Sequence, residues 1–530
     1  MSAVSRALSI TALLIALIST LILAGCRHTT PAPLLIAETL TGIAAAPQIA
    51  SDTNTSKPSA TPTITPTITP TLTPTPQPTA TSTPPPTPLP PPPGDYYPTQ
   101  ASYRLDVNLD YQAHSLQTEE HLIFTNTLGL SLTDLLLNVP PNGYNANFKL
   151  SSLLVNNRPT TYELQGTSLR VALPEMVLPG DSTALKLTFS MTAPFMRGDS
   201  IFGGGSVGYS ENAFNAGNWY PILAPYHAEQ GWQETPWHTV GDPYVTDMGD
   251  YVVTIHTLPE VTVVGPGTLE NWPSEGRWRF TISAARSFAF AASHRYESTA
   301  ETAYGLTIAS YYYPEHKISG QLALANAAAA ARLFGELFGP YPYPNLRIAE
   351  TDFSGGQEFS GFMIFGSATH QSHLDAGGGP RTIFFTLVTH ETAHQWWYGI
   401  VGNDQAREPW LDEAFAKYSE QIFYERLYPE QANWRWASMG NLERQPDLLN
   451  VTIYDYTNRA AYKNRVYLTG ALFLAQLRQA LGDDDFFALI QEHYRRGANR
   501  IVTTGEFLSL LSKYGDPAVI QPILNSYFNP

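Results

Sequence analysis

The stretch His390-Glu391-Thr392-Ala393-His394 lies within the longer run 382–397, Thr-Ile-Phe-Phe-Thr-Leu-Val-Thr-His-Glu-Thr-Ala-His-Gln-Trp-Trp. No Gly or Pro interrupts this run, and apolar residues recur at three- and four-residue steps, which predicts a largely buried helix. The two histidines stand at positions i and i+4, about 40° apart around the helix, so both imidazoles can face one metal ion. Glu391 lies about 100° from His390, where it can reach a water molecule on that metal and act as a base.

A hydrolytic zinc site usually has three protein ligands and a fourth position for water, so a third ligand must come from elsewhere. The candidate is Glu413, at the start of a second predicted helix that opens at Trp410 after a segment broken by glycine and proline. Glu413 follows His394 by 19 positions, which is enough for a loop to turn and return a carboxylate to the metal. Glu420 is seven residues further on the same helix face, where it can accept the second N–H of a ligand histidine. A surface carboxylate is the alternative interpretation of Glu420.

This spacing, with the Trp-Leu-x-Glu-x-Phe-Ala context at 410–416, resembles the gluzincin aminopeptidases of peptidase family M1, which include aminopeptidase N and leukotriene hydrolase. The resemblance implies peptide substrates and one zinc ion per chain, held by His390, His394 and Glu413, with Glu391 as the catalytic base. It also implies a multidomain α+β fold, in which an N-terminal antiparallel β-domain precedes a mainly helical, thermolysin-like zinc metallopeptidase domain. The large C-terminal helical domain of most members is not expected here.

The segment Gly355-Gly356-Gln357-Glu358-Phe359 extends the resemblance. In the family this place holds a Gly-x-Met-Glu-Asn strand whose carboxylate binds the free α-amine of the substrate, which implies substrate contacts at Gly355, Gly356 and Glu358. Gln357 and Phe359 depart from the family pattern. A thermolysin-type endopeptidase, an epoxide hydrolase and a catalytically inactive surface binding module therefore remain alternatives.

Tyr467 matches the family's catalytic tyrosine in a Tyr-x-x-Gly-Ala-x-x-Leu setting, since Gly470, Ala471 and Leu474 are all in place. Its phenol can donate to the oxyanion that forms when a carbonyl is attacked, and so complement the charge of the metal. Tyr462 is the alternative assignment.

The composition is that of a globular protein with more than one core, since 43% of the 530 residues are hydrophobic. The formal charge is −16 and no basic run occurs, so no nucleic-acid partner is expected. His370 and His373, and the run Asp483-Asp484-Asp485, fall in polar sequence and are predicted to lie on the solvated surface.

The N-terminus resembles a bacterial lipoprotein signal. Residues 7–25 are apolar and end in Leu-Ala-Gly before Cys26, the only cysteine of the chain. The resemblance implies a cleaved leader (1–25) and lipidation of Cys26, and a transmembrane anchor is the alternative. Residues 26–95 are predicted to form a disordered Thr/Pro-rich stalk, because 15 of the 36 residues from 58 to 93 are proline. Both interpretations place the protein on the outer face of a membrane.

Beyond the stalk the pattern changes twice. Residues 96–305 show period-two alternation, as in 103–111, and are predicted to form a β-sandwich-like domain. Residues 306–530 are predicted to form the catalytic domain, with helices over 322–334 and 467–481 and another opening at Thr503, whose capping box is completed by Glu506.

Overall fold

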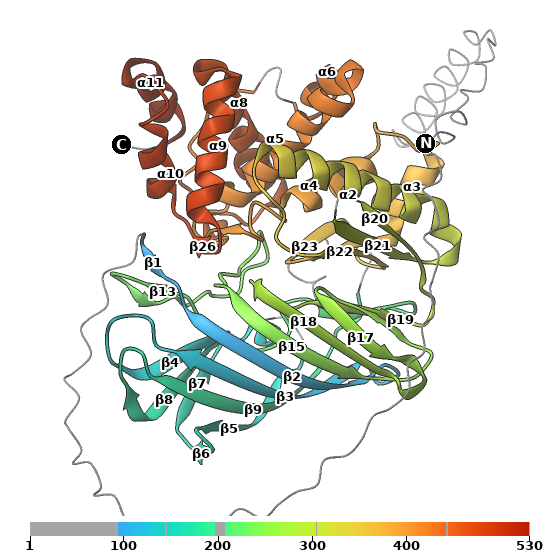
Figure 1. The fold of residues 1–530 in the computed structure, drawn as a ribbon, viewed down its shortest axis with the longest axis vertical. Coiled ribbons are helices and arrows are strands. Elements are labelled where there is room, and N and C mark those ends of the chain that lie inside the picture. Colours follow the sequence, from blue (N-terminus) through green and yellow to red (C-terminus); the bar gives the residue numbers. More distant parts are fainter. Residues whose placement is uncertain (1–93, 144–145, 197–206, 304, 441–443, 529–530) are drawn as a thin grey trace, which may run out of the picture. The chain divides into compact units, whose positions relative to one another are not determined.

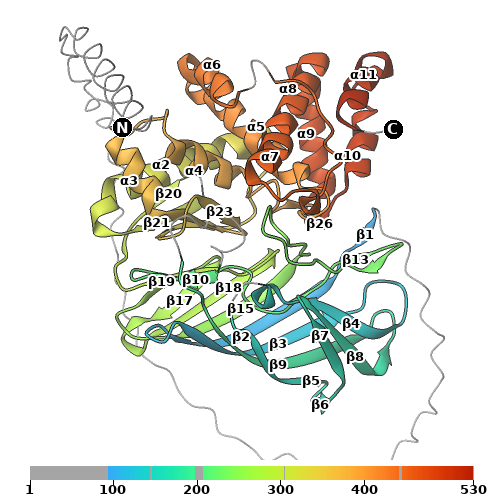
Figure 2. The ribbon, with the colours of Figure 1, turned by 180° about the vertical axis from the view of Figure 1, so that it is seen from behind.

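The computed structural model describes residues 94–528 except 144–145, 197–206, 304 and 441–443 (Figures 1 and 2). These residues all belong to one unit of the chain, 83–530. The predicted leader, Cys26 and the predicted stalk up to residue 93 lie outside the described residues. In the described part, the helices are too short or too polar to span a bilayer.

Period-two alternation builds the largest sheet of the N-terminal region. In β2, the residues Leu105, Val107 and Leu109 are buried, while the residues between them are more exposed. Within the described ranges this sheet has the strand order β17-β18-β15-β2-β3-β9-β5-β6. The strands span Thr268–Trp272 (β17), Arg277–Ala285 (β18), Gly249–His256 (β15), Gln100–Asp110 (β2), Ser115–Thr125 (β3), Ser182–Thr192 (β9), Lys149–Val155 (β5) and Arg158–Pro159 (β6).

One pair in this sheet differs from the prediction. Neighbouring strands are antiparallel, except that β15 runs parallel to β2, with Tyr251 opposite Tyr103. The prediction of antiparallel strands is therefore wrong for this pair. A long connection separates β2 from β15, so no hairpin fixes their relative direction.

Three smaller sheets complete the β-region of the described chain. Leu105 of the large sheet, Leu135 of β4 and Phe214 of β11 share one hydrophobic core, as in a sandwich of sheets. The small sheets have the orders β12-β4-β8-β7, β10-β11-β19-β16 and β1-β13-β14. Their strands span Ile222–Leu223 (β12), Leu132–Asn138 (β4), Ser168–Val177 (β8), Tyr162–Gln165 (β7), Val207–Tyr209 (β10), Phe214–Ala216 (β11), Phe290–Ser293 (β19), Thr262–Val264 (β16), Tyr96–Tyr97 (β1), Tyr226–His227 (β13) and Gly231–Trp232 (β14).

The catalytic region begins with a mixed sheet of order β20-β21-β22-β24-β23, against which α2 and α4 pack (Figure 1). Leu324 of α2, Ile348 of β22 and Val388 of α4 form one core. The predicted boundary between residues 305 and 306 falls inside the β20–β21 hairpin. The change from the sheets of the β-region to the sheet of the catalytic region lies earlier, between β19 and β20. The elements span Glu297–Ala303 (β20), Leu306–Tyr312 (β21), Asn345–Thr351 (β22), Phe362–Gly366 (β24), Gly356–Phe359 (β23), Lys317–Leu337 (α2), Ser367–Asp375 (α3) and Ile383–Ala393 (α4).

The chain then becomes helical. Predicted helices are confirmed at α2, at α5 from Trp410 onward, and at α10, where Thr503 and Glu506 form the expected capping box. The remaining elements span Trp410–Leu427 (α5), Pro429–Ser438 (α6), Arg459–Lys463 (α7), Asn464–Thr469 (η5, a π-helix), Gly470–Leu481 (α8), Asp483–Gly497 (α9), Thr504–Leu511 (α10), Pro517–Tyr527 (α11), Val401–Gly402 (β25), Arg500–Ile501 (β26), and the 3₁₀ turns Pro140–Asn142 (η1), Pro273–Glu275 (η2), Pro314–His316 (η3) and Ile453–Asp455 (η4).

Arg286, the residue after β18, connects the β-region with the catalytic region. Its buried guanidinium donates to the backbone carbonyls of Thr246, Tyr398, Ile400 and Arg500. Two of these carbonyls, those of Tyr398 and Ile400, lie in the segment between α4 and β25. A side chain at Gly402 would collide with this guanidinium, so the close approach requires glycine.

The prediction for His370 and His373 is wrong, because both are buried on α3. Their rings pack on Phe384 of α4, and Nδ1 of His373 contacts the hydroxyl of Thr382, which caps that helix. Polar composition suggested surface, but α3 packs against α4 with its histidine face. The Asp483–Asp485 run is exposed as predicted, although it forms the first turn of α9 rather than a loop.

Candidate active site

The helix α4 carries His390 and is capped at its C-terminus by His394, and the Nε2 atoms of the two histidines face each other. Thr382 caps its N-terminus by accepting from the backbone N–H of Phe385. Nδ1 of His394 lies 2.9 Å from the carbonyl oxygen of Trp397, to which its N–H can donate, and Nδ1 of His390 lies 2.9 Å from a carboxylate oxygen of Glu420. The contact of His394 favours a proton on its Nδ1, and the carboxylate beside Nδ1 of His390 favours one there too, which would leave both Nε2 lone pairs available as ligands.

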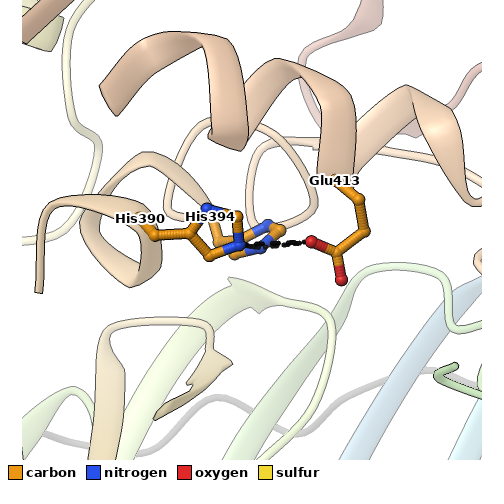
Figure 3. Close-up of side chains that lie close together, drawn as sticks. All are labelled: His390, His394 and Glu413. Atoms are coloured by element: carbon orange, nitrogen blue, oxygen red, sulfur yellow. Dashed lines mark hydrogen bonds and ion pairs between the residues drawn. The ribbon is translucent and has the colours of Figure 1, made fainter. Parts of the chain in front are cut away.

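Glu413, in the first turn of α5, completes a three-atom cluster (Figure 3). The Nε2 atoms of His390 and His394 are 3.1 Å apart, and Oε2 of Glu413 lies 3.2 and 3.3 Å from them. Burial alone would raise the pKa of Glu413, but the charges of His394 and His390 and their hydrogen bonds lower it to about 2.

This cluster fits zinc. In a tetrahedral site with bonds of about 2.0–2.1 Å, the ligand atoms are about 3.3 Å apart, which agrees with all three separations. Three lone pairs that converge in a buried place repel one another unless a cation lies between them. Two imidazoles and one carboxylate are also a donor set typical of catalytic zinc.

Glu420 lies on α5 with 1% of its side chain exposed, so the alternative of a surface carboxylate is wrong. It approaches His390 from the side opposite the ligand nitrogen, because it contacts Nδ1 rather than Nε2. The carboxylate predicted to accept from a ligand histidine therefore lies in contact with Nδ1 of His390, without the alignment of a hydrogen bond.

Glu391 is buried beside the cluster and against β23. Glu391, Glu358 and His394 each offer one polar atom, and these atoms lie within 4.8 Å of one another. A Cβ atom at Gly356 would lie only 2.5 Å from Oε1 of Glu391, so glycine is required there. Gly355 has a φ of +104°, in the left-handed region. Burial, reinforced by Glu358, raises the pKa of Glu391 well above its usual value, which suits a base that must also return a proton.

Tyr467 lies in the π-helix η5, and its hydroxyl donates to Oε1 of Glu413. Its ring stacks on that of His390, with the centroids 5.9 Å apart. The ring of Tyr462 packs edge-on against Tyr467, and its hydroxyl lies 3.0 Å from the position a Cβ would take at Gly241. Of the two tyrosines, Tyr467 is the one the structure places on a predicted metal ligand.

The sequence comparisons agree with this arrangement. Residues 324–527 match a family model described as "Peptidase family M1 domain". Residues 324–527 belong to peptidase family M1. This M1 domain contains the three clustered ligand residues, and it also contains Glu391, Glu358 and Tyr467.

The chain is similar to plant and bacterial aminopeptidases over part of its length. Aminopeptidase M1-B of Oryza sativa subsp. japonica is 32% identical over 120 residues, covering 22% of this chain and 14% of its own. Aminopeptidase N of Lactobacillus helveticus is 27% identical over 259 residues, covering 45% of this chain and 29% of its own. The chain thus spans less than a third of the length of either relative.

Solved structures support the fold of both regions. The M1 zinc metallopeptidase of Deinococcus radiodurans has a TM-score of 0.60 and 17% identity, covering 82% of this chain and 94% of its own. A two-domain M1 zinc metallopeptidase with bound L-tryptophan gives a TM-score of 0.61 at 16% identity, covering 82% and 95%. The multidomain α+β fold, a β-region followed by a mainly helical M1 domain, is therefore confirmed.

Three residues near the metal cluster were not predicted from the sequence, namely Gln405, Asp412 and Asp242. The side-chain amide of Gln405 donates to Asp412 over 2.8 Å and to Glu358 over 3.3 Å, and so links the residue before Glu413 to the predicted amine ligand. Burial and then Glu358 raise the pKa of Asp242, from the loop before β15, well above its usual value. Its Gly-Asp-Pro-Tyr sequence at 241–244 has no spacing that relates it to α4.

Proposed function

We propose that the protein is a zinc-dependent aminopeptidase that releases N-terminal residues from peptides. The observation that carries this proposal is the convergence of His390, His394 and Glu413 at 3.1–3.3 Å, beside two further carboxylates, the buried Glu391 and the partly buried Glu358. The ligand cluster supplies hydrolytic chemistry. The additional carboxylates supply a place for a positively charged substrate group.

Zinc held by the cluster would polarise the peptide carbonyl and lower the pKa of a water molecule. Glu391 is placed to take a proton from the attacking water and to pass it to the leaving amine, and its raised pKa favours this return. The hydroxyl of Tyr467, which points to Glu413, is placed to donate to the oxyanion that develops on the carbonyl. His390 and His394 remain ligands, because their Nδ1 atoms are occupied by other contacts.

Glu358 supports the restriction to a free N-terminus. Burial raises its pKa, with Glu413 acting in the same direction and His394 against it, so its ionised form lacks sufficient positive compensation. An ammonium group provides that compensation, whereas a mid-chain amide does not. A charge-assisted pair of this kind is worth a few kcal/mol.

The test compares a short peptide with its N-acetylated form, each with and without a zinc chelator. We expect acetylation to lower kcat/KM by about 100-fold or more in the wild type. Glu358→Gln should lose most of this preference, while Glu297→Gln, at an exposed glutamate of β20, should keep it. Equal cleavage of both forms by the wild type would favour an endopeptidase. No chelator-sensitive hydrolysis of any peptide would favour a binding module.

We also propose that the enzyme acts outside the cell, tethered to the membrane through a lipid on Cys26. The support is the Leu-Ala-Gly-Cys sequence at 23–26 after an apolar segment, followed by a proline-rich stretch that can serve as a spacer. The measurement is metabolic labelling with a radioactive fatty acid. Labelling of the wild type and loss of the label in Cys26→Ser are expected, and continued labelling of the variant would refute the anchor.

A further inference from the structure

Glu420 is held by two cations as well as facing a metal ligand. Its Oε1 lies 2.9 Å from Nζ of Lys417, one turn earlier on α5, and its Oε2 pairs with the guanidinium of Arg435 on α6. Arg435 also donates to the hydroxyl of Ser438 over 2.8 Å. The exposed fractions of the three charged side chains are 1% for Glu420, 13% for Lys417 and 7% for Arg435. Both carboxylate oxygens of Glu420 are therefore fixed by salt bridges in a nearly dry environment.

The contact with His390 does not fix Glu420 in the same way. Nδ1 of His390 lies 2.9 Å from Oε1, but its N–H does not point along the line of a hydrogen bond. The position of the carboxylate is consequently set by Lys417 and Arg435, and the imidazole meets a carboxylate that is already in place.

We propose that Arg435, assisted by Lys417, is a positioning residue for the metal site: it holds the carboxylate of Glu420 in place beside Nδ1 of His390, and thereby sets the orientation with which His390 binds zinc. This inference rests on the zinc peptidase proposed above, and assigns a role in metal affinity to α6, which carries no metal ligand. Outer-sphere partners of ligand histidines commonly change metal affinity 10- to 100-fold.

Arg435 is the dominant of the two cations for a chemical reason. Burial lowers the pKa of Lys417 to about 8, although Glu420 acts in the opposite direction, so Lys417 can lose its charge in mild alkali. A guanidinium keeps its charge and binds a carboxylate in a fixed plane. With two cations around one carboxylate, Glu420 adds no net negative charge near the metal. Its effect on His390 is therefore one of orientation.

The test measures zinc binding directly in the purified full-length protein. Arg435→Met, Arg435→Lys and Lys417→Met are titrated against a chromophoric chelator, and the visible absorption of the cobalt-substituted proteins reports ligand geometry. We expect the zinc Kd of Arg435→Met to rise about 10- to 100-fold, with a changed cobalt spectrum. Arg435→Lys should recover most of the affinity, and Lys417→Met should show a smaller loss than Arg435→Met.

Arg478→Met is the matched control. Arg478 on α8 pairs with Glu425 of α5 over 2.6 Å and with Asp483 of α9 over 2.8 Å, so it also anchors a helix to α5, but neither carboxylate contacts a predicted ligand. We expect this variant to lower Tm and leave the zinc Kd unchanged. The proposal is overturned if Arg435→Met lowers Tm but binds zinc as tightly as the wild type, or more tightly.

Two outcomes separate this inference from the proposed function. If the wild type binds zinc and does not hydrolyse peptides, the aminopeptidase proposal fails while the Kd comparison still decides the role of Arg435. If the wild type binds no zinc, both fail. Should Arg435→Met not fold, Arg435→Lys and Lys417→Met carry the test, and wild-type Kd values in both would overturn the inference.

Discussion

The carboxylates around His390 and His394 fall into two groups that the fold treats in opposite ways. Glu420 has Lys417 and Arg435 on its two oxygens, and although burial acts against it, these cations hold its pKa well below the usual range. Glu358, Glu391 and Asp242 are surrounded by one another and by Glu413. Burial and this crowding raise their pKa values, opposed by His394.

The difference separates a structural charge from a functional one. The protein supplies its own cations where a carboxylate only has to orient a histidine. It leaves carboxylates without that compensation where a metal ion and a substrate ammonium group are proposed to bind. Such a site costs stability in the empty protein, a cost that is common at functional sites.

The largest expected effect comes from a change at Glu391, one of the three carboxylates whose pKa values are raised. Glu391→Gln removes the base but keeps the three ligands, so we expect one zinc per chain and a loss in kcat of roughly 10⁴-fold. Metal analysis and steady-state kinetics on the same preparation check both parts. Glu413→Gln is the contrast, since it should lose zinc as well as activity. Loss of zinc from Glu391→Gln would show that Glu391 is a ligand.

A smaller effect is expected at Tyr467, which approaches the cluster through Glu413. Tyr467→Phe removes one oxyanion donor, so kcat should fall about 100-fold while the zinc content and Tm stay close to those of the wild type. Tyr462→Phe serves as the control, because its ring packs on Tyr467 but its hydroxyl points toward Gly241. A large loss in the control and none in Tyr467→Phe would reverse the assignment.

Sequence reasoning reached the residues that share one helix or one short spacing. His390 and His394 follow from helical periodicity, and the position of Glu420 from its two-turn distance to Glu413. The same reasoning found the β-region from alternation, but could not fix the direction of β15 beside β2, because direction depends on a long connection.

The residues it missed come from elements placed only by tertiary packing. Arg435 reaches Glu420 from α6, and Gln405 reaches Glu358 from the loop before α5. Neither lies in a periodic pattern or a motif with a characteristic spacing. The prediction for His370 and His373 was wrong for a related reason: polar composition does not tell which face of a short helix packs inward.

Gln405 allows a finer test of Glu358, another of the carboxylates with a raised pKa. It donates to Glu358 and Asp412, so Gln405→Leu should leave Glu358 less well positioned for a substrate ammonium group. We expect KM for a free-amine peptide to rise about tenfold with little change in kcat, since a hydrogen bond to a charged group is worth about 1.5–3 kcal/mol. Cleavage of the N-acetylated peptide should not change. A fall in kcat with constant KM would instead indicate a role in the chemical step.

The smallest expected effect concerns the free energy of unfolding that is lost when a carboxylate is buried without a cation, at a place where no ligand is proposed to bind. Glu120 of β3 lies on the core face of the large sheet, fully buried, and neither carboxylate oxygen has a hydrogen-bond partner among the described residues. Burial raises its pKa well above the usual value. As the pH rises through the unfolded-state pKa, near 4, the unfolded chain loses this proton first, so stability falls until the folded-state pKa is passed.

Glu120→Gln removes this titration and should therefore stabilise the protein at pH 8, by about 1 kcal/mol, with no comparable gain at pH 4. Glu119, the preceding residue on the same strand, is the opposite control. Hydrogen bonds from Lys186 and His121 lower its pKa, so Glu119→Gln should not stabilise the protein at pH 8. Urea unfolding at both pH values measures the differences. If Glu120→Gln gained nothing at pH 8, an unpaired buried carboxylate would be tolerated in this fold without cost, and the raised pKa values of Glu358 and Glu391 could no longer be taken as a sign of a site that awaits positive charge.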